Sequence, residues 1–128
     1  MRYVALFLFC ILVTSNAYAK EDLSGKALDC TNAQSAYWVF GKIYTYKWFV
    51  IDETPLKITK LRAHSYSTYH DKISITENYK LNRKTLGLYW QDDAKAQGKC
   101  KPITPAEIEK ILNKKIDKIK AGMKGNKF

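Results

Sequence analysis

The chain has 128 residues, and its 22 lysines and arginines against 12 aspartates and glutamates give a formal net charge of +10. This length accommodates one domain and excludes multidomain machinery. With 46% hydrophobic and 13% aromatic residues, the chain is too rich in apolar side chains to be intrinsically disordered. The composition therefore predicts one folded domain, and its positive charge raises the question of an anionic partner.

Residues 1–19 have the pattern of a cleaved signal peptide. Arg2 supplies a positive charge, an unbroken apolar run follows from 4 to 13, and Ala17 and Ala19 are the small residues that a signal peptidase reads. As a helix, the ten-residue apolar run would span about 15 Å, half the hydrocarbon core of a bilayer, so a membrane anchor is the weaker interpretation. We expect cleavage after Ala19 and a periplasmic or secreted protein.

Cleavage would remove Cys10 and leave two cysteines, Cys30 and Cys100. Two thiols in an exported domain most simply form one disulfide. It would close a loop of about 71 residues, worth on the order of 4 kcal/mol in the chain-entropy model. A redox pair and a metal pair are the alternatives. Redox cysteines lie two residues apart, however, and zinc needs partner ligands that the sequence hardly supplies.

The positive charge is concentrated near the end of the chain. Residues 20–94 contain eleven basic and nine acidic side chains, whereas residues 95–128 contain ten lysines and three acids. Of the basic residues in the whole chain, nineteen are lysine and only three are arginine. Proteins that read nucleic acids favour arginine, because its planar fork binds bidentately. We therefore expect no nucleic-acid partner, and an anionic envelope surface remains the alternative.

Short strand signals follow one another through residues 20–103. Leu28 and Cys30 alternate with polar neighbours, and apolar or alternating stretches recur near 36–40, 43–51, 56–63, 72–76, 79–81 and 86–90. Gly41 and Lys42 suit a tight turn between the stretches 36–40 and 43–51, and Pro55 lies in the turn that ends the stretch 43–51. The segment 99–101 would return the chain to the first strand. This pattern predicts a mainly β domain (20–103), an antiparallel meander or small partly closed barrel of six to eight strands.

One amphipathic helix is predicted over residues 104–121. Thr104 suits the N-cap, Pro105 the first helical position and Glu107 the third position after the cap. Gly122 could cap the other end, with a flexible tail over 122–128. We expect the helix to dock on the β-domain through its apolar stripe, formed by Ile108, Ile111, Leu112, Ile116 and Ile119. An anionic membrane is the alternative partner, and we expect at most peripheral contact there.

The sequence offers no specific support for catalysis. His64 and His70 would lie about 20 Å apart on one strand face, and adjacent His70 and Asp71 would point to opposite faces. Asp92 and Asp93 fit a loop better than a calcium site, which needs further oxygen ligands at defined offsets. No nucleophile-elbow, phosphate-loop or zinc-helix motif is present. We expect no catalytic residue, no metal and no cofactor.

Aromatic residues exceed what one small core requires. Tyrosine and tryptophan combine an apolar body with a polar group, which favours pockets and interfaces. The alternative is that they fill both faces of a thin sheet. The candidate ligand or partner surface consists of Trp38, Tyr44, Tyr46, Trp48, Tyr66, Tyr69 and Trp90.

Two resemblances accompany these features. With 23–26 (Leu-Ser-Gly-Lys), Cys30, 79–86 (Tyr-Lys-Leu-Asn-Arg-Lys-Thr-Leu) and Cys100, the chain resembles a group of small bacterial exported β-proteins with no assigned activity. A glycine near the first strand, a meander and a final helix are more loosely similar to lipocalin-like barrels, a resemblance that implies a small apolar ligand. The lipocalin pattern has a tryptophan two residues after that glycine, whereas Ala27 stands there in this chain.

The function hypothesis is a non-enzymatic exported β-domain, expected to be a monomer, that binds a small apolar ligand or an envelope component. The alternative is a protein-binding module such as a secreted enzyme inhibitor. Secreted barrel inhibitors of lysozyme are similar in size, export and an early-to-late disulfide. Their serine-glycine and tyrosine loop is not recognisable here, and 65–67 (Ser-Tyr-Ser) is a faint counterpart.

Overall fold

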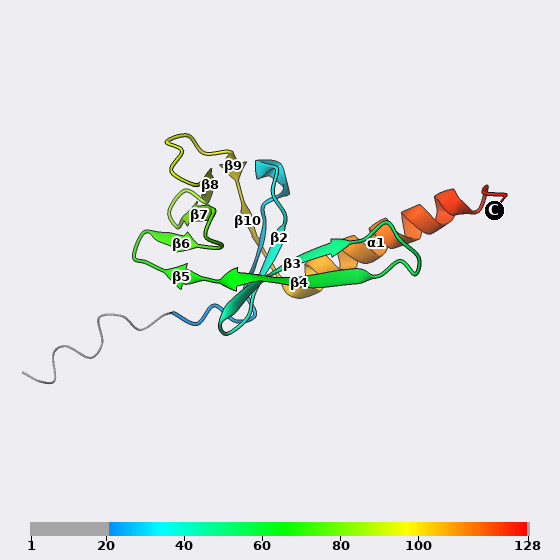
Figure 1. Ribbon diagram of the computed structural model, residues 1–128, viewed down its shortest axis with the longest axis horizontal. Coiled ribbons are helices and arrows are strands. Elements are labelled where there is room, and N and C mark those ends of the chain that lie inside the picture. Colours follow the sequence, from blue (N-terminus) through cyan, green and yellow to red (C-terminus); the bar gives the residue numbers. More distant parts are fainter. Residues whose placement is uncertain (1–20, 128) are drawn as a thin grey trace, which may run out of the picture.

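The computed structural model describes residues 21–127, so the expected signal peptide (1–19) and Phe128 lie outside the described residues. Short strands come first and one long helix comes last (Figure 1). The elements are, in chain order, β1 (Ala27–Asp29), the 3-10 helix η1 (Thr31–Ala33), β2 (Tyr37–Phe40), β3 (Tyr44–Val50), β4 (Ile58–Ser65), β5 (Ser67–Thr68), β6 (Lys72–Ser74), β7 (Tyr79–Asn82), β8 (Gly87–Trp90), β9 (Gly98–Lys99), β10 (Lys101–Ile103) and α1 (Pro105–Met123).

The first sheet has the strand order β10-β1-β2-β3-β4, and all its neighbouring strands are antiparallel. Leu28 of β1 lies opposite Trp38 of β2 and opposite Pro102 of β10. Because successive side chains of a strand point to opposite faces, Trp38 and Phe40 share one face and Val39 belongs to the other. The sheet therefore presents two apolar faces, each of which needs a covering layer.

The second sheet has the strand order β5-β6-β7-β8-β9 and is also antiparallel. Only Tyr66 separates β4 from β5, and only Cys100 separates β9 from β10. Each of these pairs therefore acts as one bent strand that passes between the sheets, so the ten strand segments of residues 21–127 count as eight strands. The predicted meander or partly closed barrel is confirmed, and the described residues form two sheets without a closed barrel.

The larger core lies between the two sheets. Cys30 and Cys100 are buried there and form the predicted disulfide. Leu28, Trp38 and Phe40 reach this core from the first sheet, as their alternation predicted. The second sheet contributes Ile73, Leu81 and Leu88. The disulfide joins the two ends of the meander, which otherwise meet only through short strands.

The smaller core lies on the opposite face of the first sheet, beneath α1. Ile108 and Leu112 of the helix are buried against Ala27, Val39 and Trp48. The helix begins as predicted, since the Thr104 hydroxyl accepts a hydrogen bond from the Glu107 backbone N–H at 3.2 Å and Pro105 follows the cap. Ile108, Leu112 and Ile116 of the predicted apolar stripe are thus buried, whereas Ile111 of that stripe is 40% exposed. No helix in residues 21–127 combines the length and apolarity needed to cross a membrane.

Two local expectations need correction. The helix passes through Gly122 and ends at Met123, with Lys124 as its C-cap in right-handed conformation, so Gly122 is not the cap. A Cβ at Gly122 would meet nothing within 4 Å, so space does not require a glycine at this position of the helix. The turn between β2 and β3 is centred on Lys42 and Ile43, one residue later than expected, because the Gly41 N–H donates to the Tyr44 carbonyl at 2.8 Å.

Candidate functional site

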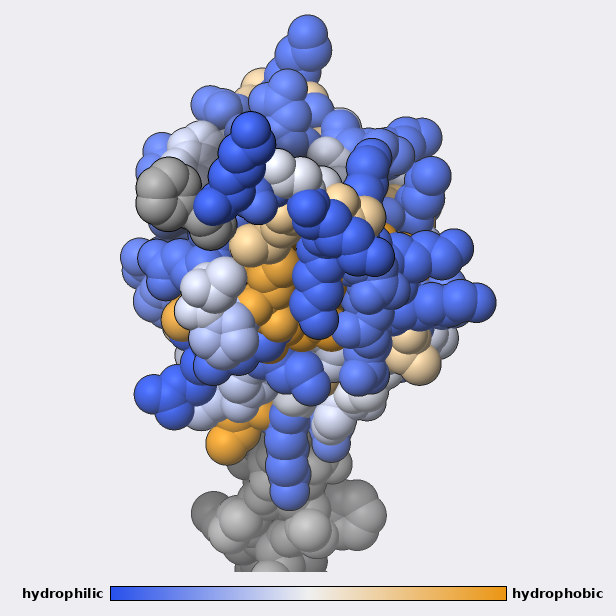
Figure 2. Space-filling view, turned by 90° about the vertical axis from the view of Figure 1, so that its right-hand side faces the viewer, coloured by the Kyte–Doolittle hydropathy of each residue, from blue (hydrophilic) through white to orange (hydrophobic). Residues whose placement is uncertain are grey.

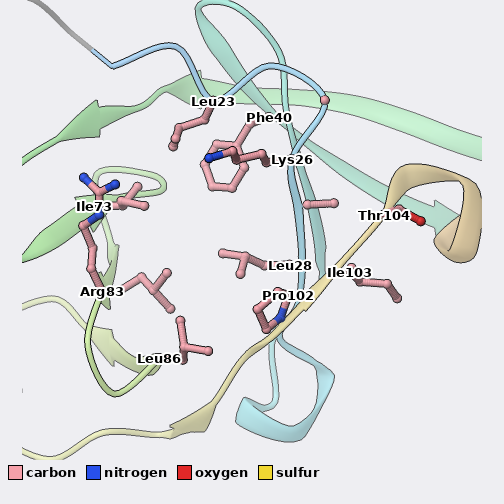
Figure 3. Close-up of a pocket in the computed structure, with 13 residues that line it drawn as sticks. Leu23, Lys26, Leu28, Phe40, Ile73, Arg83, Leu86, Pro102, Ile103 and Thr104 are labelled. Carbon is pink, nitrogen blue, oxygen red and sulfur yellow. The ribbon is translucent and has the colours of Figure 1, made fainter.

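A pocket of about 330 Å³ lies between the two sheets, where β1 and β10 face the turn from β7 to β8 (Figure 3). We call it the seam pocket, because it lies where the two sheets separate. Its volume is at the lower end of the range of about 300 to 1,000 Å³ that is typical of small-molecule sites. Apolar side chains from both sheets form its wall: Leu23, Leu28, Phe40, Ile73, Leu81 and Leu86.

The mouth of the seam pocket has a different chemistry from its wall. Lys26 and Arg83 bring two cations to it from opposite sides, as Figure 3 shows. Pro102 and Thr104 complete the mouth on the side of β10. An apolar interior with a few polar groups at its entrance is the usual composition of a ligand pocket.

A tight turn before β1 places Leu23 over the pocket. Gly25 has a φ of +82°, which glycine adopts without a steric penalty, and the Lys26 N–H donates to the Leu23 carbonyl at 3.0 Å. The Leu23 N–H in turn donates to the Tyr66 hydroxyl at 3.0 Å. The segment before the first strand is therefore part of the pocket wall and is fixed by a buried tyrosine.

Leu86 has a strained backbone at the edge of the pocket. Its φ is +62°, a left-handed conformation that costs a non-glycine residue about 1 to 2 kcal/mol. Two hydrogen bonds hold it there: its N–H donates to the Asn82 carbonyl at 2.8 Å, and its carbonyl accepts from the Cys100 N–H at 2.9 Å. The strain directs the Leu86 side chain toward the pocket (Figure 3). Retained strain of this kind is enriched at functional sites.

The seven aromatic residues proposed as a surface do not gather at one place, and none of them lines the seam pocket. Trp38 and Tyr66 are buried between the sheets, with exposed fractions of 5% and 1%. The Tyr66 hydroxyl donates to the Gly41 carbonyl at 2.8 Å, so it fixes the β2–β3 turn. Trp90 packs edge-on against Tyr79, with ring centroids 5.0 Å apart.

Of the other aromatic residues in that set, Trp48 is buried in the smaller core, and Tyr44, Tyr46 and Tyr69 are only partly buried or exposed. Tyr44, Tyr46 and Trp48 follow one another along the outer face of β3, and cations from β4 cover two of them. The Lys60 ammonium lies 4.2 Å from the Trp48 ring centroid, and the Arg62 guanidinium lies 4.7 Å from that of Tyr44. Tyr46 and Trp48 also line a shallow second pocket of about 300 Å³ beside Val39. Tyr69 is half-exposed at the far end of the second sheet.

The two histidines lie apart from both pockets. The imidazole of His64 is exposed and lies 3.8 Å from the Glu77 carboxylate, whereas His70 is in the turn between β5 and β6. Within residues 21–127, no three histidine, cysteine, aspartate or glutamate side chains gather closely enough to hold a metal ion.

The lysine-rich second half of α1 lies at one end of the molecule, whereas β9 and β10 lie beside the second sheet (Figure 1). Figure 2 looks onto that end and shows hydrophilic side chains over most of it, around a smaller apolar strip. Lys114, Lys115 and Lys118 of α1 are exposed. The buried face of α1 is directed at the sheet, so these lysines form its solvated side.

The seam pocket has no single signal in the sequence, because its walls come from segments that are distant in the chain. The stretch 23–26, singled out above only for a resemblance, supplies both Leu23 and the cation of Lys26. The stretch 79–86 likewise supplies Leu81, Arg83 and Leu86. Comparison with models of known protein families, with curated proteins and with solved structures gives no match for this chain.

Proposed function

We propose that the chain is a non-enzymatic binding protein of the periplasm or the extracellular space, which holds a small apolar ligand or an envelope component in the seam pocket. The observation that carries this proposal is the pocket itself, an apolar space of about 330 Å³ that opens between two sheets. A cavity with an apolar wall and few polar groups is the default ligand site of a protein without a catalytic cluster.

Two further observations support the proposal. The Leu86 backbone is strained at the point where its side chain lines the pocket, and relief of that strain would require the pocket to change shape. The disulfide between Cys30 and Cys100 suits an oxidising compartment, in agreement with export and cleavage after Ala19. Export would thus bring the seam pocket to the compartment that contains envelope components.

The test uses N-phenyl-1-naphthylamine, an uncharged apolar dye that fluoresces in apolar surroundings. We expect saturable binding of one dye per chain. Leu28→Phe fills part of the pocket and should weaken binding at least tenfold, because the added ring occupies the space of the dye. Val39→Ile, on the opposite face of the same sheet, is the matched control and should bind as the parent does. Native mass spectrometry of the exported protein should also show a retained ligand.

A folded Leu28→Phe protein that binds the dye as tightly as the parent would contradict the proposal. Circular dichroism and the melting temperature establish whether the variant folds. If it does not fold, Leu86→Phe takes its place, because Leu86 also lines the pocket but is only partly buried at the edge of the core.

The open edge of β4 favours a second candidate function, a protein-binding module such as a secreted enzyme inhibitor. Within the described part of the chain, β4 (Ile58–Ser65) is the longest strand and pairs only with β3, so its outer edge is open. Leu61 at its centre is 53% exposed. An open edge of this length can accept a further strand.

The charges on β4 indicate which strand it would accept. Two copies paired antiparallel about Leu61 would place Lys60 opposite Arg62, and like charges directly opposite each other are destabilising. The edge therefore disfavours a second copy and suits an extended acidic segment of another protein. A peptide with alternating glutamate and threonine should shift the NMR signals of β4 amides, and a lysine-threonine peptide should not. Equal shifts with both peptides would exclude this function.

A further inference from the structure

The two cations at the mouth of the seam pocket have different partners. Arg83 is already neutralised, since its guanidinium lies 2.7 Å from the Glu21 carboxylate and donates to the Tyr69 carbonyl at 2.9 Å. Lys26 forms no ion pair with any residue in 21–127. Figure 3 shows its side chain extending across Phe40 toward the space between the walls. The mouth thus has one spare positive charge.

A spare ammonium group discriminates between classes of ligand. A neutral apolar molecule that reaches the mouth removes water from Lys26 and offers nothing in exchange, which costs free energy. An anion at the same position replaces that water with a charge-assisted hydrogen bond. The pocket therefore favours a molecule with an apolar body and an anionic end, even though most of its wall is apolar.

The volume of the pocket limits the length of the apolar body. A methylene group takes up about as much space as a water molecule, whose share of the liquid is about 30 Å³. A volume of about 330 Å³ therefore holds a chain of on the order of ten carbons. A single chain fits this space, whereas a two-chain lipid would leave most of its carbons outside.

We infer that the seam pocket binds a single-chain amphiphile with an anionic head group, with the head at Lys26 and about ten carbons among Leu28, Phe40 and Leu81. This inference rests on the proposed function and specifies its ligand class. A carboxylate and a phosphate monoester share the required chemistry. Arg83 holds Glu21 beside the same mouth, so this carboxylate opposes the incoming anion.

The effect of Lys26 should be moderate and sensitive to salt. The side chain is exposed, and ion pairs of exposed side chains contribute up to about 1 kcal/mol, which corresponds to about fivefold in affinity. The contribution should fall as ionic strength rises, because salt screens exposed charges beyond about 8 Å at physiological concentration.

The experiment measures three ten-carbon probes, decanoate, decyl phosphate and decanol, by displacement of the uncharged dye from the exported protein. We expect the anions to bind more tightly than decanol. Lys26→Met should weaken both anions about fivefold and leave decanol unchanged or slightly tighter. Lys42→Met is the matched control, because it removes the same charge from an exposed turn that does not line the pocket. A preference between the two anions identifies the head group.

Glu21→Gln provides a second variant with the opposite sign. It removes the competing carboxylate and frees Arg83, so both anions should bind more tightly while decanol binding stays the same. Decanol binding as tight as that of decanoate, or equal effects of Lys26→Met and Lys42→Met, would overturn the inference and leave the proposed function intact. Failure of all three probes and of the dye to bind would instead overturn the proposed function.

Discussion

The two faces of the first sheet are covered in different ways. The inner face meets a second sheet of short strands, and this layer contains the disulfide, the strained Leu86 and the seam pocket. The outer face meets one helix, which buries Ile108 and Leu112, one helical turn apart, against the sheet. The inner layer thus depends on covalent linkage and unusual backbone conformations. The outer layer depends on side-chain packing and on the cations of β4 that lie over Trp48 and Tyr44.

This difference supports placing the proposed ligand site in the inner layer. Regular packing of a helix on a sheet leaves little reason for strain, whereas a site for a ligand requires space that the neighbouring chain would otherwise fill. The inner layer keeps such a space between its two sheets and is held together by the Cys30–Cys100 bond, whereas the pocket beside Val39 is lined by the first sheet and its β2–β3 turn alone. The comparison predicts that changes to the two layers have separable consequences.

Loss of the disulfide should have the largest effect. Replacing both Cys30 and Cys100 with alanine frees a long loop in the unfolded chain, and we expect the free energy of unfolding to fall by about 4 kcal/mol. Urea denaturation measures this loss. The parent protein in a reducing agent is the control and should approach the stability of the variant. A loss below about 1 kcal/mol would show that the inner layer does not depend on the bond.

Shortening a buried side chain of α1 should have the second-largest effect on stability. Ile108 is fully buried, so Ile108→Ala should cost about 3 kcal/mol through lost burial and the cavity left behind. Glu109→Ala on the exposed side of α1 is the matched control and should change stability by less than about 0.5 kcal/mol. Hydrogen exchange should show faster exchange in α1 with β7 and β8 still protected. Equal acceleration of exchange in α1 and in β7 and β8 would show that the two layers unfold as one unit.

The sequence predicted the features that rest on local or pairwise signals. The N-cap at Thr104 is determined by neighbours within four residues, and the pairing of Cys30 with Cys100 was predicted because Cys10 lies in the expected signal peptide. The inward direction of Leu28 and Trp38 follows from the two-residue period of a strand. Each of these inferences needed one segment or one pair of residues.

The seam pocket needed several segments at once and was therefore not predictable. Its walls combine Leu23 before β1, Phe40 at the end of β2 and Leu86 after β7. The left-handed conformation of Leu86 has no signal in the sequence, because leucine rarely adopts it. The tyrosines and tryptophans attracted attention instead, yet Trp38 and Tyr66 fill the core beside the pocket. Aromatic content alone did not distinguish residues that line a pocket from residues that fill the core.

The same substitution, glycine to alanine, can be made in each layer: at Gly98 in β9 of the inner layer and at Gly122 in α1 of the outer layer. A Cβ at Gly98 would lie 2.8 Å from the Ala33 Cα and 2.9 Å from the Asn32 carbonyl oxygen, and the φ of +157° is also unsuited to alanine. Gly98→Ala should therefore cost about 2 kcal/mol. Gly122→Ala meets nothing within 4 Å and lies in α1, so it should stabilise by up to about 1 kcal/mol. Thermal denaturation measures both changes, and equal signs would contradict the comparison.

The smallest expected effect concerns the alkaline stability of the outer layer. Burial, and to a lesser extent the Asp29 carboxylate on the neighbouring strand, raise the pKa of Tyr37 above its ordinary value of 10.0. Between the ordinary and the raised pKa the unfolded chain has lost the Tyr37 proton while the folded chain keeps it, so stability falls as the pH rises through that window. Tyr37→Phe removes the proton from both states. The free energy of unfolding, measured from pH 7 upward and compared with each protein's own value at pH 7, should therefore fall less steeply in the variant. Parallel curves would show that Tyr37 ionises equally in the folded and unfolded states, and that the helix leaves this end of the outer face open to water.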